Sequence, residues 1–108
     1  MRAADQGHAA AQNNLGLLHM EGRGVDRDVA RAAEWYSRAA EQGLAHAQAN
    51  LGVLHLYGQG VPRDPRRARE LLTQAAEQGH PRAQGVLGSM YYEGFGVPRD
   101  PDQALRWS

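Results

Sequence analysis

Small and apolar residues recur along the chain at the spacing of an α-helix. In residues 8–21, Ala11, Leu15 and Leu18 follow one another at intervals of four and three, with Gly16 beside Leu15. Such a series forms one stripe that is buried along a single helix face. The stripe returns as two further sets, Ala47, Leu51, Leu54 and Ala83, Leu87, Met90. No β pattern occurs, so the sequence predicts an all-α fold.

The pattern repeats at a fixed interval of 36 residues, the spacing that separates Gly7, Gly43 and Gly79. The same interval aligns Gly16, Gly52, Gly88; Asp28, Asp64, Asp100; and Ala32, Ala68, Ala104. A fixed period of this size is typical of a repeat array. We therefore expect one repeat domain over 1–108, phased as 8–43, 44–79 and 80–108, with 1–7 as the tail of a preceding repeat.

Each period contains two helical patterns separated by residues that end helices. Asp28, Asp64 and Asp100 have the position of N-caps, and the prolines that follow the last two suit a first helical turn. Gly43 and Gly79 suit the left-handed position after a helix. These signals predict helices near 8–21, 29–42, 44–57, 65–78 and 80–93, with half-helices at both ends of the chain.

Two nearly identical loops, "GQGVPRDP" at 58–65 and "GFGVPRDP" at 94–101, join the helices of a pair, and "GRGVDRDV" at 22–29 is a third copy. A phosphate-binding loop with this Gly-x-Gly pattern follows a β-strand, which the sequence lacks. We interpret the loops as hinges in which glycine supplies backbone angles that other residues resist. The glycines inside the first helices, Gly16, Gly52 and Gly88, imply that another helix backbone packs against each of them.

The run "AQANLGVLHLYGQGVPRDPRRARELLTQAAEQG" at 47–79 resembles the Sel-one-like repeat (SLR) family, relatives of tetratricopeptide repeats. The resemblance covers essentially the whole chain in three copies. His19 and His55 occupy a place that Tyr usually holds, as Tyr91 does, and Leu71 replaces an aromatic residue. The resemblance implies a right-handed α-solenoid of antiparallel helix pairs that acts as a scaffold or adaptor for a protein or peptide.

Composition narrows the possible functions. The 12 basic residues are all Arg and are balanced by 12 acidic residues, which argues against nucleic acid as a partner. No apolar run is long enough for a signal peptide or for membrane insertion, so a cytoplasmic location is expected if Met1 is the native start. Some cysteine-rich SLR proteins are linked to β-lactam binding or hydrolysis, but this chain has no Cys, which leaves that activity a weak third alternative.

No residues form a recognisable catalytic or metal-binding motif, and we expect neither an enzyme nor a cofactor. His19 and His55 lie one period apart, roughly 10 Å on stacked helices, too far to share one metal ion. Ser37, Ser89 and Thr73 lack the local pattern of a nucleophile with a histidine and an acid. The regularly spaced aspartates are explained as helix caps.

The first helix of each pair is expected to line the concave face, as in tetratricopeptide-like stacks. On that face we place Asn13, Leu17, Met20, His46, Val53, Leu56, Arg82, Ser89 and Tyr92, and next to them Ala10, Ala49 and Gly85. These positions vary between copies while the core positions do not, as expected for a peptide-binding groove. The alternative is that the apolar members only help neighbouring helices to pack.

The two ends of the chain read as halves of one helix. "DPDQALRWS" at 100–108 followed by "MRAADQG" at 1–7 aligns with residues 64–79. A solenoid without capping repeats leaves at each end a surface that suits another repeat. This predicts either a piece of a longer array, in which the chain is a structural spacer, or molecules that stack head to tail through 1–7 and 100–108.

Overall fold

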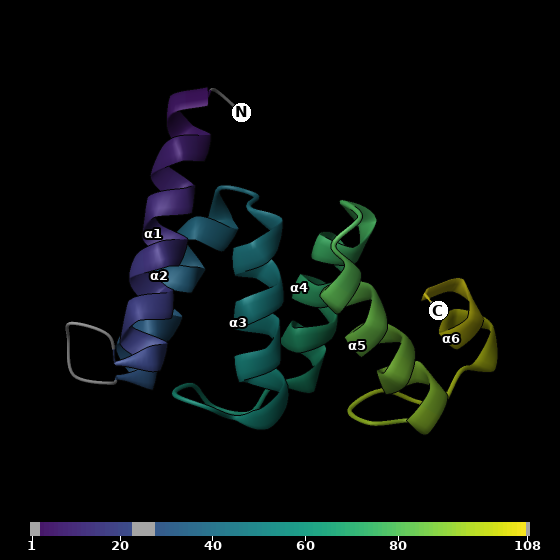
Figure 1. Ribbon diagram of the computed structural model, residues 1–108. Coiled ribbons are helices and arrows are strands. Elements are labelled where there is room, and N and C mark those ends of the chain that lie inside the picture. The colour runs from purple at the N-terminus through teal and green to yellow at the C-terminus, as the bar shows by residue number, and fades with distance from the viewer. Residues whose placement is uncertain (1–2, 23–27, 108) are drawn as a thin grey trace.

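A computed structural model describes residues 3–22 and 28–107 of the chain. These residues form six helices and no strand: α1 (Ala3–Glu21), α2 (Val29–Glu41), α3 (Ala45–Tyr57), α4 (Pro65–Glu77), α5 (Pro81–Glu93) and α6 (Pro101–Trp107). Each helix packs mainly against the helices before and after it in the chain. The helices therefore follow one another across an elongated molecule of 42 × 30 × 18 Å (Figure 1). This arrangement confirms the predicted all-α solenoid.

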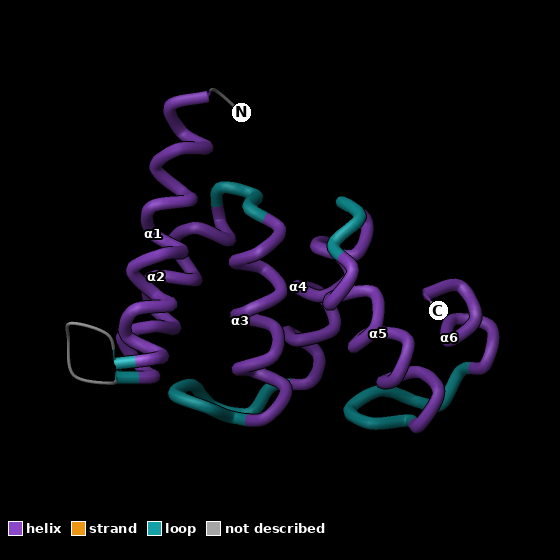
Figure 2. The backbone as a smooth tube through the Cα atoms, in the orientation of Figure 1, coloured by secondary structure: helices purple, strands orange, loops and turns teal. Residues whose placement is uncertain are grey.

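Successive helices are joined alternately by a long loop and a short turn. Figure 2 shows the long loops after α3 and α5 at one edge of the molecule, and the short turns after α2 and α4 at the opposite edge. In the short turns the chain reverses direction at Gly43 and Gly79, whose φ angles of 88° and 86° lie in the left-handed region. Both glycines therefore have the conformation that the sequence predicts for them.

The aspartates cap the second helix of each pair, as predicted. A side-chain oxygen of Asp28 accepts a hydrogen bond from the Arg31 amide at 3.0 Å, and Asp64 accepts one from the Arg67 amide at 3.1 Å. Asp100 accepts bonds from the amides of residues 102 and 103. Each carboxylate thus satisfies donors at the helix start that have no partner within the helix.

The long loops need glycine because they cross the start of the second helix of the preceding pair. Gly60 and Gly96 have φ angles of 72° and 75°. A Cβ at Gly60 would lie 2.7 Å from the carbonyl oxygen of Val29, and one at Gly96 would lie 2.9 Å from Cβ of Pro65. The hinge interpretation is therefore correct for these two loops; residues 23–27 of the third copy lie outside the described part.

The glycines inside the first helices accommodate close packing of the second helix, whose side chains come nearest at Gly16 and Gly52 and whose backbone also lies within 4 Å at Gly52 and Gly88. A Cβ at Gly16 would lie 2.5 Å from Cε1 of Tyr36, and one at Gly52 would lie 2.9 Å from Cγ of Leu72. The space beside Gly88 is wider, and its nearest atoms are 3.6 Å away. The residue equivalent to Tyr36 and Leu72 in that pair is residue 108, which lies outside the described part.

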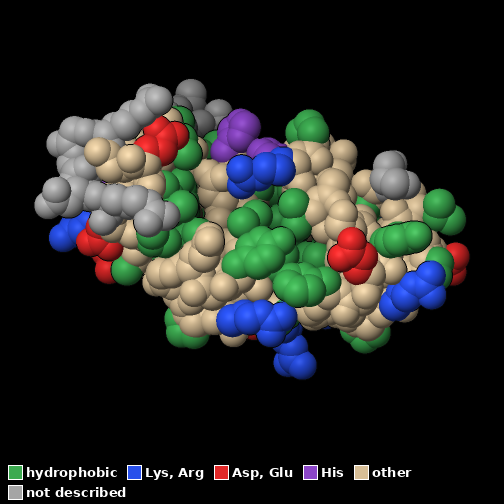
Figure 3. All heavy atoms as spheres, turned by 60° about the horizontal axis from the view of Figure 1, so that its bottom comes forward, with side chains coloured by type: hydrophobic (Ala, Val, Ile, Leu, Met, Phe, Trp, Pro, Cys, Tyr) green, Lys and Arg blue, Asp and Glu red, His purple; other side chains and the backbone are tan. Residues whose placement is uncertain are grey.

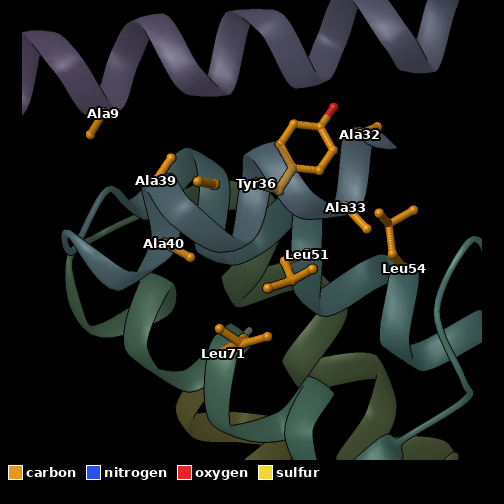
Figure 4. Packing of buried hydrophobic residues seen from close by; sticks show 10 residues of the cluster. Ala9, Ala32, Ala33, Tyr36, Ala39, Ala40, Leu51, Leu54 and Leu71 are labelled. Atoms are coloured by element: carbon orange, nitrogen blue, oxygen red, sulfur yellow. The ribbon is translucent and has the colours of Figure 1, made fainter. Parts of the chain in front are cut away.

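Two clusters of buried side chains form the core, one over the first two helix pairs and one over the last two. In Figure 4 the ring of Tyr36 points from α2 toward α1, while Leu51 and Leu71 lie near each other on the other side of α2. Tyr36 is 2% exposed, and its burial raises the pKa of the phenol to about 12. Burying side chains of this size contributes about 1.5–3 kcal/mol each.

Glutamines tie the two helices of a pair together by a contact that the sequence analysis did not foresee. Gln42 Nε2 donates to Gln12 Oε1 at 2.6 Å, and one period later Gln78 Nε2 donates to Gln48 Oε1 at 2.8 Å. Gln12 and Gln48 are buried. Their amides are therefore satisfied inside the stack at equivalent places in both pairs.

The start of the chain differs from the prediction of a separate half-helix that ends at Gly7. α1 begins at Ala3 and continues through Gly7 without a turn, so that it extends past the other helices in Figure 1. At the later turns, Gln42 and Gln78 bond back to the first helix of their own pair. Residues 3–7 instead continue α1, and the helix pairs their backbone groups at a cost of about 1 kcal/mol for Gly7.

Candidate partner-binding face

The face formed by α1, α3 and α5 carries most of the residues that the sequence analysis placed there. His46, Arg82, Ser89 and Tyr92 are exposed, Tyr92 by 64% of its surface. Leu17 is 38% exposed. The half-buried members are Met20 and Val53. These seven side chains are accessible to a partner to differing degrees.

Two of the nine expected groove residues are buried, as is Ala49, which was placed next to them. Leu56 is 1% exposed and belongs to the second core cluster, where Leu72 and Met90 also lie. It is therefore a core residue, which corrects its assignment to the accessible surface. Asn13 is 7% exposed, and its side-chain oxygen accepts a hydrogen bond from Asn50 Nδ2 at 3.1 Å. Asn13 is therefore a buried residue that holds the half-buried Asn50 in place.

A hollow of about 290 Å³ lies between α1 and α3, and we call it the polar hollow. Leu17, Met20 and Val53 belong to its apolar lining. Its remaining lining residues are Glu21, Tyr36, Asn50, Leu54, Gln59 and Arg82. The hollow therefore brings together four of the nine residues predicted for the groove, and it adds polar groups that were not predicted.

A second hollow of about 340 Å³, the aromatic hollow, lies between α3 and α5. Its walls include Tyr57 and Phe95, whose ring centres are 5.9 Å apart. Tyr57 is 57% and Phe95 39% exposed. The other lining residues are Leu56, Gly85, Val86, Ser89, Met90 and Glu93. Figure 3 shows a hydrophobic patch at the middle of the face that carries the long loops, with basic side chains on two sides.

The two hollows are the same place in successive repeats. Six lining residues of the polar hollow have their one-period equivalents in the aromatic hollow, in the pairs Met20/Leu56, Glu21/Tyr57, Asn50/Val86, Val53/Ser89, Leu54/Met90 and Gln59/Phe95. The helix pairs therefore create the hollow, and the side chains at its rim set its chemistry. Tyr57 and Phe95 were missed because they lie at the ends of the hinge loop, although both positions vary between copies.

Hydrogen bonds fix polar side chains across the three inner helices. Arg82 Nη2 donates to Asn50 Oδ1 at 2.6 Å, and Asn50 in turn donates to Asn13. Arg82 is exposed and pairs with no carboxylate among residues 8–22 and 28–107. A guanidinium held in this way offers its remaining donors to an acceptor outside the chain.

Two histidines meet beside Arg82. His80 Nδ1 accepts a hydrogen bond from the Ala83 amide at 3.2 Å, so the ring proton lies on Nε2, which is 3.0 Å from Nδ1 of His46. Burial lowers the pKa of His80, and the charges of His46 and Arg82 lower it further. The predicted helix near 80–93 starts at this residue, and in the structure His80 is the N-cap of α5.

The two stacked histidines differ in their partners: His55 Nδ1 donates to the carbonyl oxygen of Pro62 at 3.4 Å. His19 Nδ1 is buried without a partner in the described ranges. The residue equivalent to Pro62 is Asp26, which lies outside those ranges. Within them, no three His, Cys, Asp or Glu side chains gather as metal ligands. The described helices also include none with the length and apolar character needed to cross a bilayer.

A third hollow of about 570 Å³ lies at the end of the array between α5 and α6. Tyr92, Leu105 and Trp107 are among its lining residues, and Leu105 is 74% exposed. At the opposite end, Leu15 and Leu18 are each 38% exposed, whereas their equivalents Leu51 and Leu54 are 3% and 2% exposed. Both ends of the described array therefore present apolar surface.

Comparison with known proteins places this architecture in a family. A model of the Sel1 repeat matches residues 9–44, 45–80 and 81–108. The crystal structure of c5321, a protective antigen of uropathogenic Escherichia coli strains that displays an SLR fold, is 45% identical with a TM-score of 0.90, covering 97% of this chain and 22% of that chain. No curated protein matches the chain in sequence.

Two further structures are similar. A Sel1 repeat protein from Oxalobacter formigenes is 38% identical with a TM-score of 0.88, over 99% of this chain and 44% of that one. Cysteine rich protein B (hcpB) of Helicobacter pylori is 25% identical with a TM-score of 0.67, over 71% of this chain and 58% of that one. The chain thus spans less than two thirds of each of the three structures. Because three successive matches cover nearly all of its residues, the chain belongs to the Sel1 repeat family.

Proposed function

We propose that the chain is a non-catalytic interaction scaffold that binds a peptide segment of a partner protein across α1, α3 and α5. Sel1 repeats commonly serve protein–protein interaction, which supports the general role. The observation that carries the proposal is the pair of hollows at equivalent places in successive repeats. The two hollows are lined by equivalent helix positions but carry different side chains. This is expected for a surface on which each repeat contacts a different part of one ligand.

The exposed aromatic side chains of the aromatic hollow favour a binding role. Tyr57 and Phe95 leave large apolar surfaces in water at the edge of a concave site. Aromatic residues are enriched where proteins bind partners, because a rigid ring buries much area at a small entropic cost. The neighbouring polar hollow adds fixed polar groups, Arg82 and Asn50, to apolar lining residues, a combination that is typical of a site that recognises a specific ligand.

Peptide selection tests this function directly. The immobilised 108-residue chain is used to select peptides from a displayed random library, and their affinities are then measured by fluorescence anisotropy. We expect the double variant Tyr57→Ser/Phe95→Ser to weaken the selected peptides at least tenfold. Trp35→Ser, at a half-buried aromatic side chain of α2 that lines neither hollow, is the matched control and should bind as the unchanged chain does.

The same experiment separates the alternatives. A structural spacer enriches no peptide, and a partner surface elsewhere enriches peptides that bind the double variant and the unchanged chain equally. Either result contradicts the proposal. Thermal melting of both variants shows whether each remains folded, so that a loss of binding is assigned to the hollow.

The ends of the described array support a second proposal, head-to-tail self-association. Leu15 and Leu18 occupy the positions at which Leu51 and Leu54 pack in the core with α2. In a stack of molecules, α1 of one copy would lie over the hollow between α5 and α6 of the next, as α3 lies over the first pair and α5 over the second. Such a contact joins two different surfaces and extends without closing.

A further inference from the structure

The chemistry of the two hollows indicates what kind of peptide the face accepts. Three polar rim residues of the polar hollow, Glu21, Asn50 and Gln59, are replaced one period later by Tyr57, Val86 and Phe95. The aromatic hollow therefore suits a bulky apolar side chain. The polar hollow instead presents charged and amide groups next to its apolar lining residues.

The cation of the polar hollow suits a carboxylate. Arg82 is exposed, its guanidinium is held by Asn50 at 2.6 Å, and the described ranges supply no acid that pairs with it. Glu21, an acidic side chain of the same hollow, has an interaction of its own. A planar guanidinium fixed by one bond and open on its other donors binds carboxylates with good geometry.

The distance between these two features follows from the helix that carries both. Arg82 and Ser89, which lines the aromatic hollow, are seven residues apart on α5. Residues seven apart lie on one helix face, and a rise of 1.5 Å per residue separates them by about 10 Å. An extended peptide advances about 3.3 Å per residue, so three residues cover this distance.

We propose that the face recognises an extended segment in which an acidic side chain on Arg82 stands three residues from a bulky apolar side chain in the aromatic hollow. This inference rests on the proposed function and specifies its ligand. The occupant is a peptide with negative charge, because the group presented to it is a cation. Arg63, whose guanidinium carbon lies 5.5 Å from the Phe95 ring centre, adds a second cation next to a residue that lines the aromatic hollow.

Labelled Gly-Ser peptides of eight residues provide the probes. One carries Asp-Gly-Ser-Phe, a second carries the reverse order, a third has Asp next to Phe, and a fourth has Lys in place of Asp in the order that binds better. Anisotropy is measured with the protein up to about 1 mM, which detects weak complexes. We expect a peptide with the three-residue spacing to bind at least fivefold tighter than the third and fourth peptides.

Charge reversal at Arg82 is the decisive variant. In Arg82→Glu the preference for Asp over Lys should invert, while Arg66→Glu, at an exposed arginine of α4, should keep it. A preference that stays unchanged in Arg82→Glu overturns the inference, as does the failure of all four peptides to bind. Library peptides that bind at Tyr57 and Phe95 but lack the spaced acid would overturn the inference alone and leave the proposed function standing.

Discussion

The backbone of Gly60 passes so close to Val29 that a Cβ on Gly60 would lie 2.7 Å from the Val29 carbonyl oxygen. The two residues belong to neighbouring helix pairs, and one period later Gly96 meets Pro65 in the same way. The hinge loop therefore connects the helices of its own pair and also packs on the preceding pair. The loops contribute to the stacking of the repeats.

This relationship predicts that Gly60→Ala destabilises the chain by about 2 kcal/mol or more. The Cβ would clash with backbone and would also occupy a φ of 72°, which L-residues resist. Gly79→Ala is the matched control, because its φ is 86° but nothing lies within 4 Å. Its cost should be about 1 kcal/mol in urea unfolding. Equal losses in the two variants would show that the loop contact adds nothing.

Two glycines within helices should respond in opposite directions to the same change. A Cβ in Gly52→Ala would lie 2.9 Å from Leu72 and 3.4 Å from the Ala68 carbonyl oxygen, so we expect a loss of about 1–3 kcal/mol. Gly85 has open space around it, and Gly85→Ala should stabilise α5 by about 0.5–1 kcal/mol. Urea unfolding of both variants measures the difference, and a loss at Gly85 would contradict the reason given for it.

The sequence allowed the repeats to be predicted because their local signals agree. The interval of 36 residues, the capping aspartates and the glycines of the short turns all indicate the same helix pairs. Nine of the ten predicted helix starts and ends lie within one residue of those observed. The period was less informative at the ends. Residues 1–7 align with the end of a helix, yet Ala3–Glu21 is one continuous helix.

The candidate site was predictable only in part, because burial depends on neighbours that differ along the stack. Met20, Leu56 and Tyr92 are equivalent by period, but they are half-buried, buried and exposed in turn. The polar contacts were also hidden, since the bond from Arg82 to Asn50 joins residues 32 positions apart on different helices. Periodicity identifies the face, whereas the side chains that meet on it depend on the three-dimensional packing.

The exposed leucines of α1 lead to a prediction about association. We expect the weight-average mass of the unchanged chain, measured by light scattering, to rise with concentration. Leu15→Gln/Leu18→Gln should reduce this rise, because it removes apolar surface at one end of the stack. Leu17→Gln, equally exposed at 38% but lining the polar hollow, is the control. If the unchanged chain stays monomeric at high concentration, the head-to-tail contact does not form.

A related variant tests the heterologous nature of that contact. Leu105→Glu/Trp107→Glu alters the other end of the stack, where both side chains line the hollow between α5 and α6. Each of the two end variants should be monomeric alone. An equal mixture of the two should form dimers and no larger assemblies, because only one intact end remains on each molecule. A mixture that remains monomeric would contradict pairing between the two ends.

The N-cap of α5 makes stability depend on pH. The folded chain lowers the pKa of His80 below its ordinary 6.5, mainly through burial, so the unfolded chain binds a proton there more readily. The free energy of unfolding should therefore fall as the pH drops below about 6.5, and it should keep falling until the folded pKa is passed. Structurally, a proton on Nδ1 would displace the Ala83 amide from its bond.

His80→Asn removes the titration and keeps a side chain that caps helices well. Its stability in urea should match that of the unchanged chain near pH 7.5 and exceed it near pH 5, because only the unchanged chain loses the cap in acid. His8→Asn is the control, since His8 has the equivalent repeat position but lies inside α1 and caps no helix. If His80→Asn and the unchanged chain lose stability in parallel between these pH values, the cap of α5 is not the group that titrates.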